Sequence, residues 1–355
     1  MEWTMTTEMF KQIKNGYNPL IIALFCGALS VPLYAREIND MYGRKVTVPD
    51  KIARVFSISP SVTYVIYAID PDLIVGLNRK TPDSEKPYLR KSYQDLPVLG
   101  GAFGTGLTLN LESVLNLRPD VLVVWGGDGA YDKKTAEKIY DLNIPVVSVD
   151  IDSLSRYADT FAFLGKLLNR EKRAGELADY TRRALSEVKN IVSKIPAEKR
   201  ISVYNGRMKD GLNTACENSW HAELIPMAGG INPAKCTSGE FTGIEKISME
   251  QLLIMNPDTI LALDASFAAN VYRDERWQDI KAVKTKRVYL SPKEPLNWFD
   301  GPPSFMGILG LQWLTRCLYP DYYHKDIEEE TKHFVRLFFG VDLSEENIKR
   351  IINGN

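Results

Sequence analysis

The stretch EKRAGELADYTRRALSEVKNIVSKI, residues 171–195, decides the fold of this chain. Leu177, Ala184 and Val188 recur in it at helical spacing, and charged residues fill the positions between them. Pro196 ends the pattern, because proline cannot continue a helix. A helix over the whole stretch would be roughly 37 Å long. We therefore expect one long helix that joins two lobes and limits their closure on a ligand.

Short apolar runs lie on both sides of this stretch and alternate with helical patterns. Continuous runs of Val, Ile and Leu between helices are typical of parallel sheets that are covered on both faces. The runs are 54–58, 73–76, 121–125 and 145–149 before the long helix, and 201–204, 259–263 and 287–290 after it. The pattern predicts an α/β protein with two Rossmann-like lobes joined by one long α-helix. The expected parts are a signal peptide (1–35), an N-terminal lobe (36–168), a linker helix (169–198) and a C-terminal lobe (199–355).

An internal repeat supports the division into two lobes. Residues 109–115 form an apolar helical pattern with a glutamate, and Pro119-Asp120 and a strand follow. Residues 247–253 repeat this pattern at a constant offset, with Pro257-Asp258 before the next strand. Because the copies lie on opposite sides of the long helix, they indicate two lobes of like topology.

The N-terminus predicts export from the cytoplasm. Lys11 and Lys14 precede an apolar run from Leu20 to Leu33, and the small residue Ala35 closes the segment. This order is that of a secretory signal peptide cleaved near Ala35. A membrane anchor is the alternative, but the run is short for a span of about 20 residues.

The composition argues against some functions but does not decide whether the cysteines form a disulfide. The formal net charge of the 355 residues is -1, which argues against nucleic acid as a partner. Cys216 and Cys236 could pair in an oxidising compartment, and free buried thiols are the alternative. The glycines of residues 100–106 have the wrong spacing for a dinucleotide fingerprint, and no nucleophile–histidine arrangement is visible. We therefore expect neither an enzyme nor a bound cofactor.

Several motifs, taken in order, resemble periplasmic binding proteins for iron complexes and vitamin B12, the class whose lobes are linked by a single long helix. They span roughly residues 38–320 and include DMYGRKV (40–46), NLE (110–112) with RPD (118–120), NIPVV (143–147), AGGIN (228–232) and ISMEQ (247–251). The resemblance implies a periplasmic protein that binds its ligand in the cleft between the lobes. It also implies delivery of the ligand to the permease and ATPase of an ABC importer. Glu112 and Glu250 would then dock onto arginines of the two membrane subunits.

Candidate ligand-binding residues follow predicted strands, because ligands of doubly wound sheets sit at the carboxyl ends of the strands. In the first lobe they are Ser59 and Pro60, at a strand-to-helix turn, and Trp125 and Tyr131 near the next strand end. In the second lobe they are Asn205, Arg207, Trp220, His221 and Trp298. Arg207 could pair with an anionic group, and Trp298 could stack on a flat ligand. Each of these residues also has a plain structural interpretation.

The sequence leaves the identity of the ligand open. Siderophore binders that use a metal-ligating histidine carry it just before the second glutamate helix, but residues 241–246 contain none. His221 could ligate a metal instead, although a lone histidine is more often structural. We expect a metal complex, of the iron–siderophore type or another chelate. The alternatives are vitamin B12, haem or an oxyanion such as molybdate, and, in a different class, a Rossmann-type enzyme.

Overall fold

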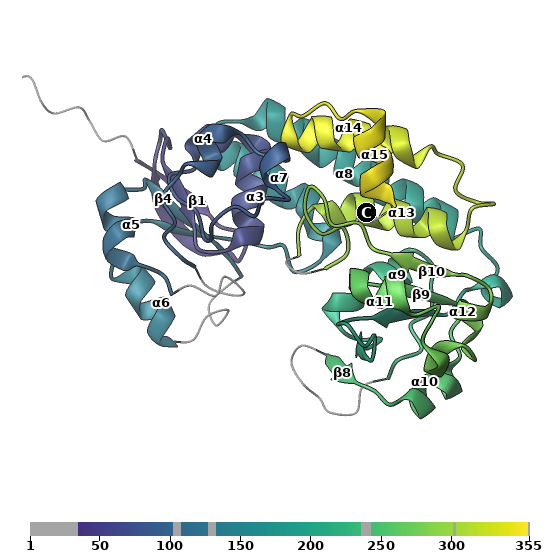
Figure 1. The fold of residues 1–355 in the computed structure, drawn as a ribbon. Coiled ribbons are helices and arrows are strands. Elements are labelled where there is room, and N and C mark those ends of the chain that lie inside the picture. The colour runs from purple at the N-terminus through teal and green to yellow at the C-terminus, as the bar shows by residue number, and fades with distance from the viewer. Residues whose placement is uncertain (1–34, 102–107, 127–132, 236–242, 301–302, 354–355) are drawn as a thin grey trace, which may run out of the picture.

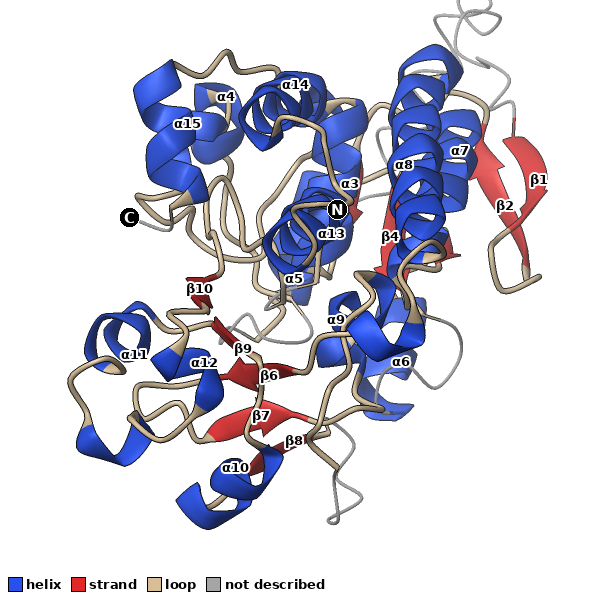
Figure 2. Cartoon of the chain, turned by 90° about the vertical axis from the view of Figure 1, so that its right-hand side faces the viewer, coloured by secondary structure: helices blue, strands red, loops and turns tan. Residues whose placement is uncertain are grey.

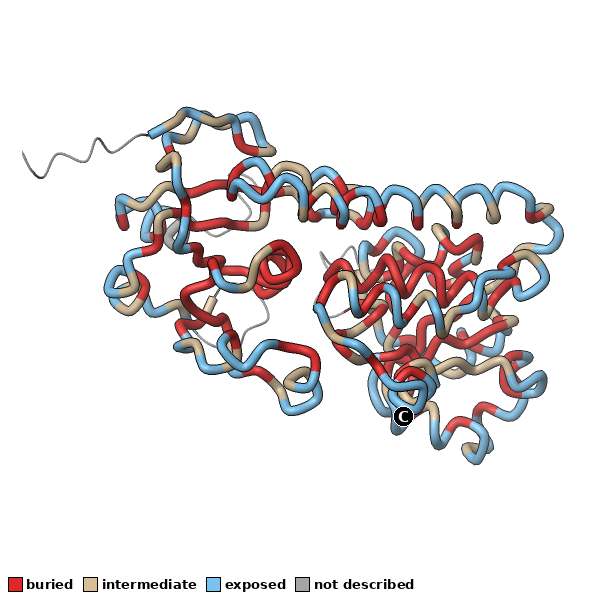
Figure 3. Tube along the Cα trace, turned by 90° about the horizontal axis from the view of Figure 1, so that it is seen from above, coloured by how far each residue is buried: buried red, intermediate tan, exposed pale blue. Residues whose placement is uncertain are grey.

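The chain folds into two α/β lobes joined by one long helix. The computed structural model describes residues 35–101, 108–126, 133–235, 243–300 and 303–353. Figure 1 shows the two lobes side by side, and Figure 3 shows the long helix α8 (Glu171–Val192) running past both. The predicted signal peptide lies outside the described residues, apart from Ala35. None of the described helices combines the length and the apolar character that crossing a membrane requires.

The first lobe is built on a parallel sheet with strand order β3-β4-β5. Its strands are short and, apart from Trp125 at the end of β4, buried, because both faces are covered by other elements. They are β3 (Val55–Ser57), β4 (Val121–Trp125) and β5 (Val146–Val149), and the helices are α3 (Pro60–Ile69), α4 (Lys91–Gln94), α5 (Leu111–Leu117), α6 (Lys133–Tyr140) and α7 (Tyr157–Leu168). Short 3₁₀ turns are η1 (Pro71–Leu73), η2 (Lys86–Tyr88) and η3 (Leu154–Arg156), and an antiparallel hairpin of β1 (Ala35–Asn39) and β2 (Lys45–Pro49) precedes the sheet.

The second lobe repeats this plan with the parallel order β10-β9-β6. Its strands are β6 (Val203–Gly206), β9 (Thr259–Ala262) and β10 (Val288–Leu290), and β7 (Asn213–Ala215) pairs antiparallel with β8 (Ile244–Lys246). The helices are α9 (Leu224–Met227), α10 (Met249–Met255), α11 (Ala265–Asn270) and α12 (Lys281–Lys284), with 3₁₀ turns η4 (Ala197–Lys199), η5 (Trp220–Ala222) and η6 (Glu275–Trp277). The fold class expected from the sequence is therefore confirmed.

One predicted strand is reduced to a single bridge. Ile74 makes one parallel bridge with Val55, but residues 73–76 do not form a strand. The reason is local: Asp70 caps the 3₁₀ turn η1 by accepting a hydrogen bond from the N–H of Asp72, and that turn holds Leu73. The other predicted runs are strands. Strand β4 has the expected bounds, β6 begins and ends two residues later than expected, and the remaining four strands are one or two residues shorter.

Helix α8 ends three residues earlier than the sequence pattern suggested, and at 22 residues it is about 33 Å long. Its buried residues form one stripe at helical spacing: Ala174, Leu177, Ala178, Tyr180, Thr181, Ala184 and Val188. The stripe packs on α7, which lies beside α8 in Figure 2, and on α13 (Met306–Leu318). Helix α8 is therefore packed against other helices from Ala174 to Val188.

The C-terminal helices bind the two lobes together. Helix α13 packs on α8 and α9, and α14 (Ile327–Phe339) packs on α3 of the first lobe. Phe338 of α14 contacts Phe161 of α7 with 5.8 Å between ring centroids, and its ring stacks on Phe305 at 4.9 Å. The last helix, α15 (Glu345–Ile352), packs on α14. Residues after 199 thus contribute to the core of the first lobe as well as to the second.

The internal repeat has the same local structure in both lobes. Asn110 caps α5 and Ser248 caps α10, each accepting a hydrogen bond from the N–H three residues on. Arg118 and Asn256 end the two helices in the left-handed conformation, with φ of 46° and 36°. The repeat therefore corresponds to the same short capped helix, present once in each lobe.

The aspartate that follows each helix ties it to the adjacent strand. Asp120 accepts hydrogen bonds from the N–H groups of Ala53 and Arg54 at 2.7 and 2.8 Å, just before β3. Asp258 accepts them from the N–H and hydroxyl of Ser202 at 2.8 and 2.9 Å, just before β6. In both lobes the Pro-Asp turn thus fixes the start of a neighbouring strand.

The cysteines differ in state. Cys216 takes part in a disulfide, and Cys317 is a free thiol. Cys236, the partner that the sequence suggested for Cys216, lies outside the described residues.

Candidate ligand cleft between the lobes

A small cavity of about 40 Å³ lies where the two lobes face each other. On the first lobe it begins at Trp125, the last residue of β4, and continues through the segment after β5. This is the carboxyl edge of the sheet, where ligands of such folds bind. The lining residues are Trp125, Ile151, Asp152, Ser153, Leu154 and Tyr157 from the first lobe, with Trp220, His221, Glu223, Leu224, Phe299, Asp300, Pro303, Ser304 and Gly307 opposite.

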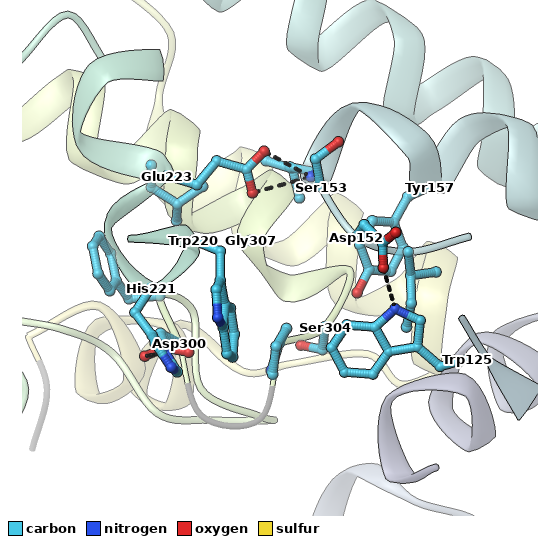
Figure 4. Close-up of a pocket in the computed structure, with 15 residues that line it drawn as sticks. Trp125, Asp152, Ser153, Tyr157, Trp220, His221, Glu223, Asp300, Ser304 and Gly307 are labelled. Atoms are coloured by element: carbon cyan, nitrogen blue, oxygen red, sulfur yellow. Dashed lines mark hydrogen bonds and ion pairs between the residues drawn. The ribbon is translucent and has the colours of Figure 1, made fainter. Parts of the chain in front are cut away.

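Two tryptophans stand on opposite sides of the cavity, as Figure 4 shows. The indole N–H of Trp125 donates to the carboxylate of Asp152 at 2.7 Å, which fixes the orientation of this ring. Trp220 lies 40% exposed in the turn η5 and contacts the ring of His221, with 3.4 Å between centroids and an interplanar angle of 30°. The cavity therefore has two aromatic walls, one from each lobe.

Asp300, which lines the cavity, contacts two basic side chains. One of its carboxylate oxygens accepts a hydrogen bond from a guanidinium N–H of Arg207 at 2.8 Å and lies 2.6 Å from Nδ1 of His221. The side chain of Asp300 is 3% exposed, and its second oxygen has no partner among the described residues. A buried carboxylate is stable when it is paired with a cation, as this one is with Arg207. The charge of Arg207 is thus largely balanced within the protein.

Two further carboxyl groups line the cavity without a cationic partner among the described residues. Asp152 accepts hydrogen bonds from the neutral groups of Trp125 and Tyr42, the latter at 3.1 Å. Glu223 accepts from the N–H of Leu154 at 3.0 Å and so links the second lobe to the first. Burial raises the pKa of Glu223, because the charged form loses hydration there. The lining therefore carries more acidic than basic charge.

Some residues predicted from the sequence lie elsewhere. Ser59 and Pro60 are buried at the start of α3, and Pro60 lines a separate, smaller cavity beside Asn78 and Arg79. Asn205 is fully buried in β6, and both polar atoms of its amide lack a partner among the described residues. Tyr131 falls outside the described residues.

The stacking role suggested for Trp298 is wrong. This side chain is 0% exposed, its indole N–H donates to the carbonyl of Glu294 at 2.7 Å, and its ring packs edge-on against Trp313. Trp298 is also absent from the lining of the cavity, and its backbone carbonyl lies directly against Gly310 of α13. Trp298 is a core residue that anchors the loop after β10.

Sequence reasoning missed the three carboxylates of the cavity. Asp152 and Asp300 both follow strands, so the strand-end signal that selected Trp125 and Trp298 also applies to them. Glu223 gives no such signal, because it stands between the 3₁₀ turn η5 and helix α9 of the second lobe. Of the predicted residues, the cavity brings together Trp125, Trp220 and His221, with Arg207 held behind Asp300.

Both predicted docking residues are exposed and stand in the first turn of a short helix. Glu112 follows the cap of α5, and Glu250 follows the cap of α10. A hydrogen bond from Ser248 lowers the pKa of Glu250 and keeps it ionised. The two carboxylates thus occupy equivalent positions on the two lobes.

Comparison with known proteins identifies the family. Residues 55–295 match the model of the periplasmic binding protein family. An ABC transporter solute-binding protein of Sulfurospirillum deleyianum is 36% identical, with a TM-score of 0.82 over 89% of this chain and 98% of that one. The molybdate-binding protein MolA of Haemophilus influenzae is 26% identical over 93% of this chain and 99% of its own length. A vitamin B12-binding protein of Vibrio cholerae is 21% identical over 70% of this chain and 84% of its own. The chain therefore belongs to the periplasmic binding protein family and is a solute-binding protein of ABC transporters.

Proposed function

We propose that this protein captures a compact metal complex in the cavity between Trp125 and Trp220 and delivers it to the permease of an ABC importer. The observation that carries the proposal is the charge of the lining. Asp152 and Glu223 receive hydrogen bonds from neutral donors, while Arg207 is already paired with Asp300. An unbalanced acidic lining attracts a cationic metal centre and opposes a free anion.

The dimensions of the cavity narrow the class of complex. A volume of about 40 Å³ between the described residues holds roughly three water molecules. A metal ion with small organic ligands suits this space better than a corrinoid, a haem or a bulky siderophore. The aromatic walls supply flat apolar contacts for the organic part of such a complex.

An oxyanion is the second candidate, because the MolA relative binds molybdate and covers nearly the whole chain. Only one nitrogen of Arg207 is engaged among the described residues, so its other N–H groups are available to an oxygen ligand. The acidic lining weighs against this candidate.

We also propose that the chain is exported and works in the periplasm with Glu112 and Glu250 docked on the permease. The order of charged, apolar and small residues in 1–35 supports export. The equivalent positions of the two glutamates on α5 and α10 support docking on a two-fold symmetric basic partner. We expect no catalytic activity.

The test is direct analysis of the protein purified from its native compartment. Mass spectrometry and elemental analysis should find one metal atom per chain together with a small organic molecule. Trp220→Ala should lose this cargo, whereas Tyr272→Ala should keep it, since Tyr272 is an aromatic of similar exposure outside the cavity. Calorimetry with sodium molybdate tests the oxyanion candidate. Tight binding of molybdate, together with the absence of a metal complex in the purified protein, would reject the metal-complex proposal.

A further inference from the structure

His221 is held on three sides at the wall of the cavity. The hydroxyl of Ser219 accepts the N–H of His221 at 3.2 Å and caps the turn η5. The ring lies against the indole of Trp220, and Nδ1 lies 2.6 Å from the carboxylate of Asp300. With a side chain that is 11% exposed, His221 has little freedom to turn. A histidine fixed in this way presents its remaining nitrogen, Nε2, in one direction.

The partner of Nδ1 determines what Nε2 can do. Asp300 also accepts from Arg207, so the aspartate and the arginine form a pair without net charge. Such a pair can accept a hydrogen bond from Nδ1–H. In the tautomer with the proton on Nδ1, the lone pair lies on Nε2, which is then a metal ligand and not a hydrogen-bond donor. A carboxylate behind a histidine is the usual arrangement that orients a metal-binding imidazole.

The protein supplies too few groups to hold a bare metal ion. Among the residues that the structure describes, no cluster of three or more His, Cys, Asp or Glu side chains could do so. A single imidazole in a cavity can complete a coordination sphere that another molecule has mostly filled. Imidazole nitrogen suits copper, nickel, zinc and iron.

We propose that Nε2 of His221 coordinates the metal of the bound complex directly, so that the ligand is a chelate with an open coordination position. This inference rests on the proposed function and makes it more specific. Asp300 is a positioning residue, since it acts through His221. Saturated chelates, in which every coordination position is occupied, would bind without this bond and more weakly.

The chain allows a clean spectroscopic test, because it has only three histidines. His324 and His333 are exposed, so His324→Gln with His333→Gln leaves His221 as the one imidazole. The probe is Cu(II)–iminodiacetate, a tridentate chelate with open positions, and Cu(II)–EDTA is the control in which the chelator occupies the metal. Electron paramagnetic resonance of the mature full-length protein should show nitrogen coupling from imidazole with the first probe and not with the second.

Substitutions then test whether His221 forms the bond to the metal. Adding His221→Gln should remove the nitrogen coupling and weaken Cu(II)–iminodiacetate at least tenfold. Asp300→Asn should keep the coupling but weaken binding by about 10-fold to 100-fold, as loss of an orienting partner does. Circular dichroism melting curves identify any variant that fails to fold. Equal binding by the His221→Gln variant, or no imidazole coupling in its parent, would overturn the inference.

The outcomes separate this inference from the proposed function. If the protein carries a native metal complex but His221→Gln retains it with unchanged affinity, direct coordination is wrong and the transport function stands. If neither a native complex nor the chelate probe is bound, the proposed ligand class itself is wrong.

Discussion

The carboxylate of Glu294, in the loop after β10 of the second lobe, accepts a hydrogen bond from the hydroxyl of Tyr88 in the first lobe, with 2.6 Å between the oxygens. Arg350 of the last helix α15 closes the arrangement. Its guanidinium donates to both oxygens of Glu294 at 2.8 and 2.7 Å and to the hydroxyl of Tyr88 at 3.1 Å. We call these three residues the interlobe clamp. It joins the two lobes and the C-terminus, segments that lie far apart in the sequence.

We predict that Arg350→Met weakens the association of the lobes. The variant loses a bidentate pair and leaves Glu294 with Tyr88 alone. Because the side chain of Arg350 is 40% exposed, we expect a loss of about 1 kcal/mol in the free energy of unfolding, the upper end for screened ion pairs. Urea unfolding measures this loss. The distribution of distances between spin labels on the two lobes should also become broader.

Arg336→Met is the matched control, because Arg336 pairs with Asp342 at 3.5 Å and both side chains are exposed. The two pairs differ in that only the first one joins the lobes. Equal effects of the two substitutions would show that the clamp contributes no more than a surface pair.

The clamp should also weaken in acid. The hydrogen bond from Arg350 lowers the pKa of Glu294, and Tyr88 lowers it further. A carboxyl group with a lowered pKa stabilises the folded state above its unfolded pKa of about 4.3, and this contribution is lost as the pH falls through the folded value. The difference in stability between wild type and Glu294→Gln should therefore be constant near neutrality and shrink below about pH 4. A difference that stays constant down to pH 3 would contradict this assignment.

Local patterns in the sequence were sufficient for the fold. The apolar stripe around Leu177 and Val188 predicted α8, and the repeated Pro-Asp turns at Asp120 and Asp258 predicted two lobes of one plan. These signals lie within one element or one turn, so no tertiary contact is needed to detect them.

The site was less predictable because its chemistry depends on contacts between distant residues. Arg207 was expected to face an anion, but Asp300, far along the chain, neutralises it. Trp298 follows a strand as Trp125 does, yet the close approach of α13 at Gly310 buries it. Position after a strand locates the edge of a cleft, and the surrounding helices decide which side chains reach it.

The Pro-Asp turns allow the same stability prediction to be tested once in each lobe. Asp120→Ala leaves the N–H groups of Ala53 and Arg54 without their acceptor, and Asp258→Ala does the same to Ser202. Each should cost about 1–3 kcal/mol of unfolding free energy, as expected for charge-assisted hydrogen bonds. Asp83→Ala is the control, since Asp83 is exposed and forms an ion pair with the nearby Lys86. Chemical denaturation gives the change in unfolding free energy for each of the three variants, provided that the dependence of this free energy on denaturant concentration has the same slope as in the wild type.

The docking proposal predicts a loss of transport without a loss of binding. Glu112→Arg together with Glu250→Arg reverses both carboxylates, which are exposed and do not line the cavity, so folding and ligand affinity should remain near those of the wild type. Uptake of the native ligand by cells that carry only this variant should collapse, because like charges would oppose the encounter with a basic partner. Reversing charge in the first turn of a helix also opposes the helix dipole. The control is therefore Glu329→Arg with Glu346→Arg, two exposed glutamates in the first turns of α14 and α15. Normal uptake by the control and none by the docking variant is the expected result. If the docking variant transports as well as its control, Glu112 and Glu250 are ordinary surface residues, and the permease must recognise another face of the protein.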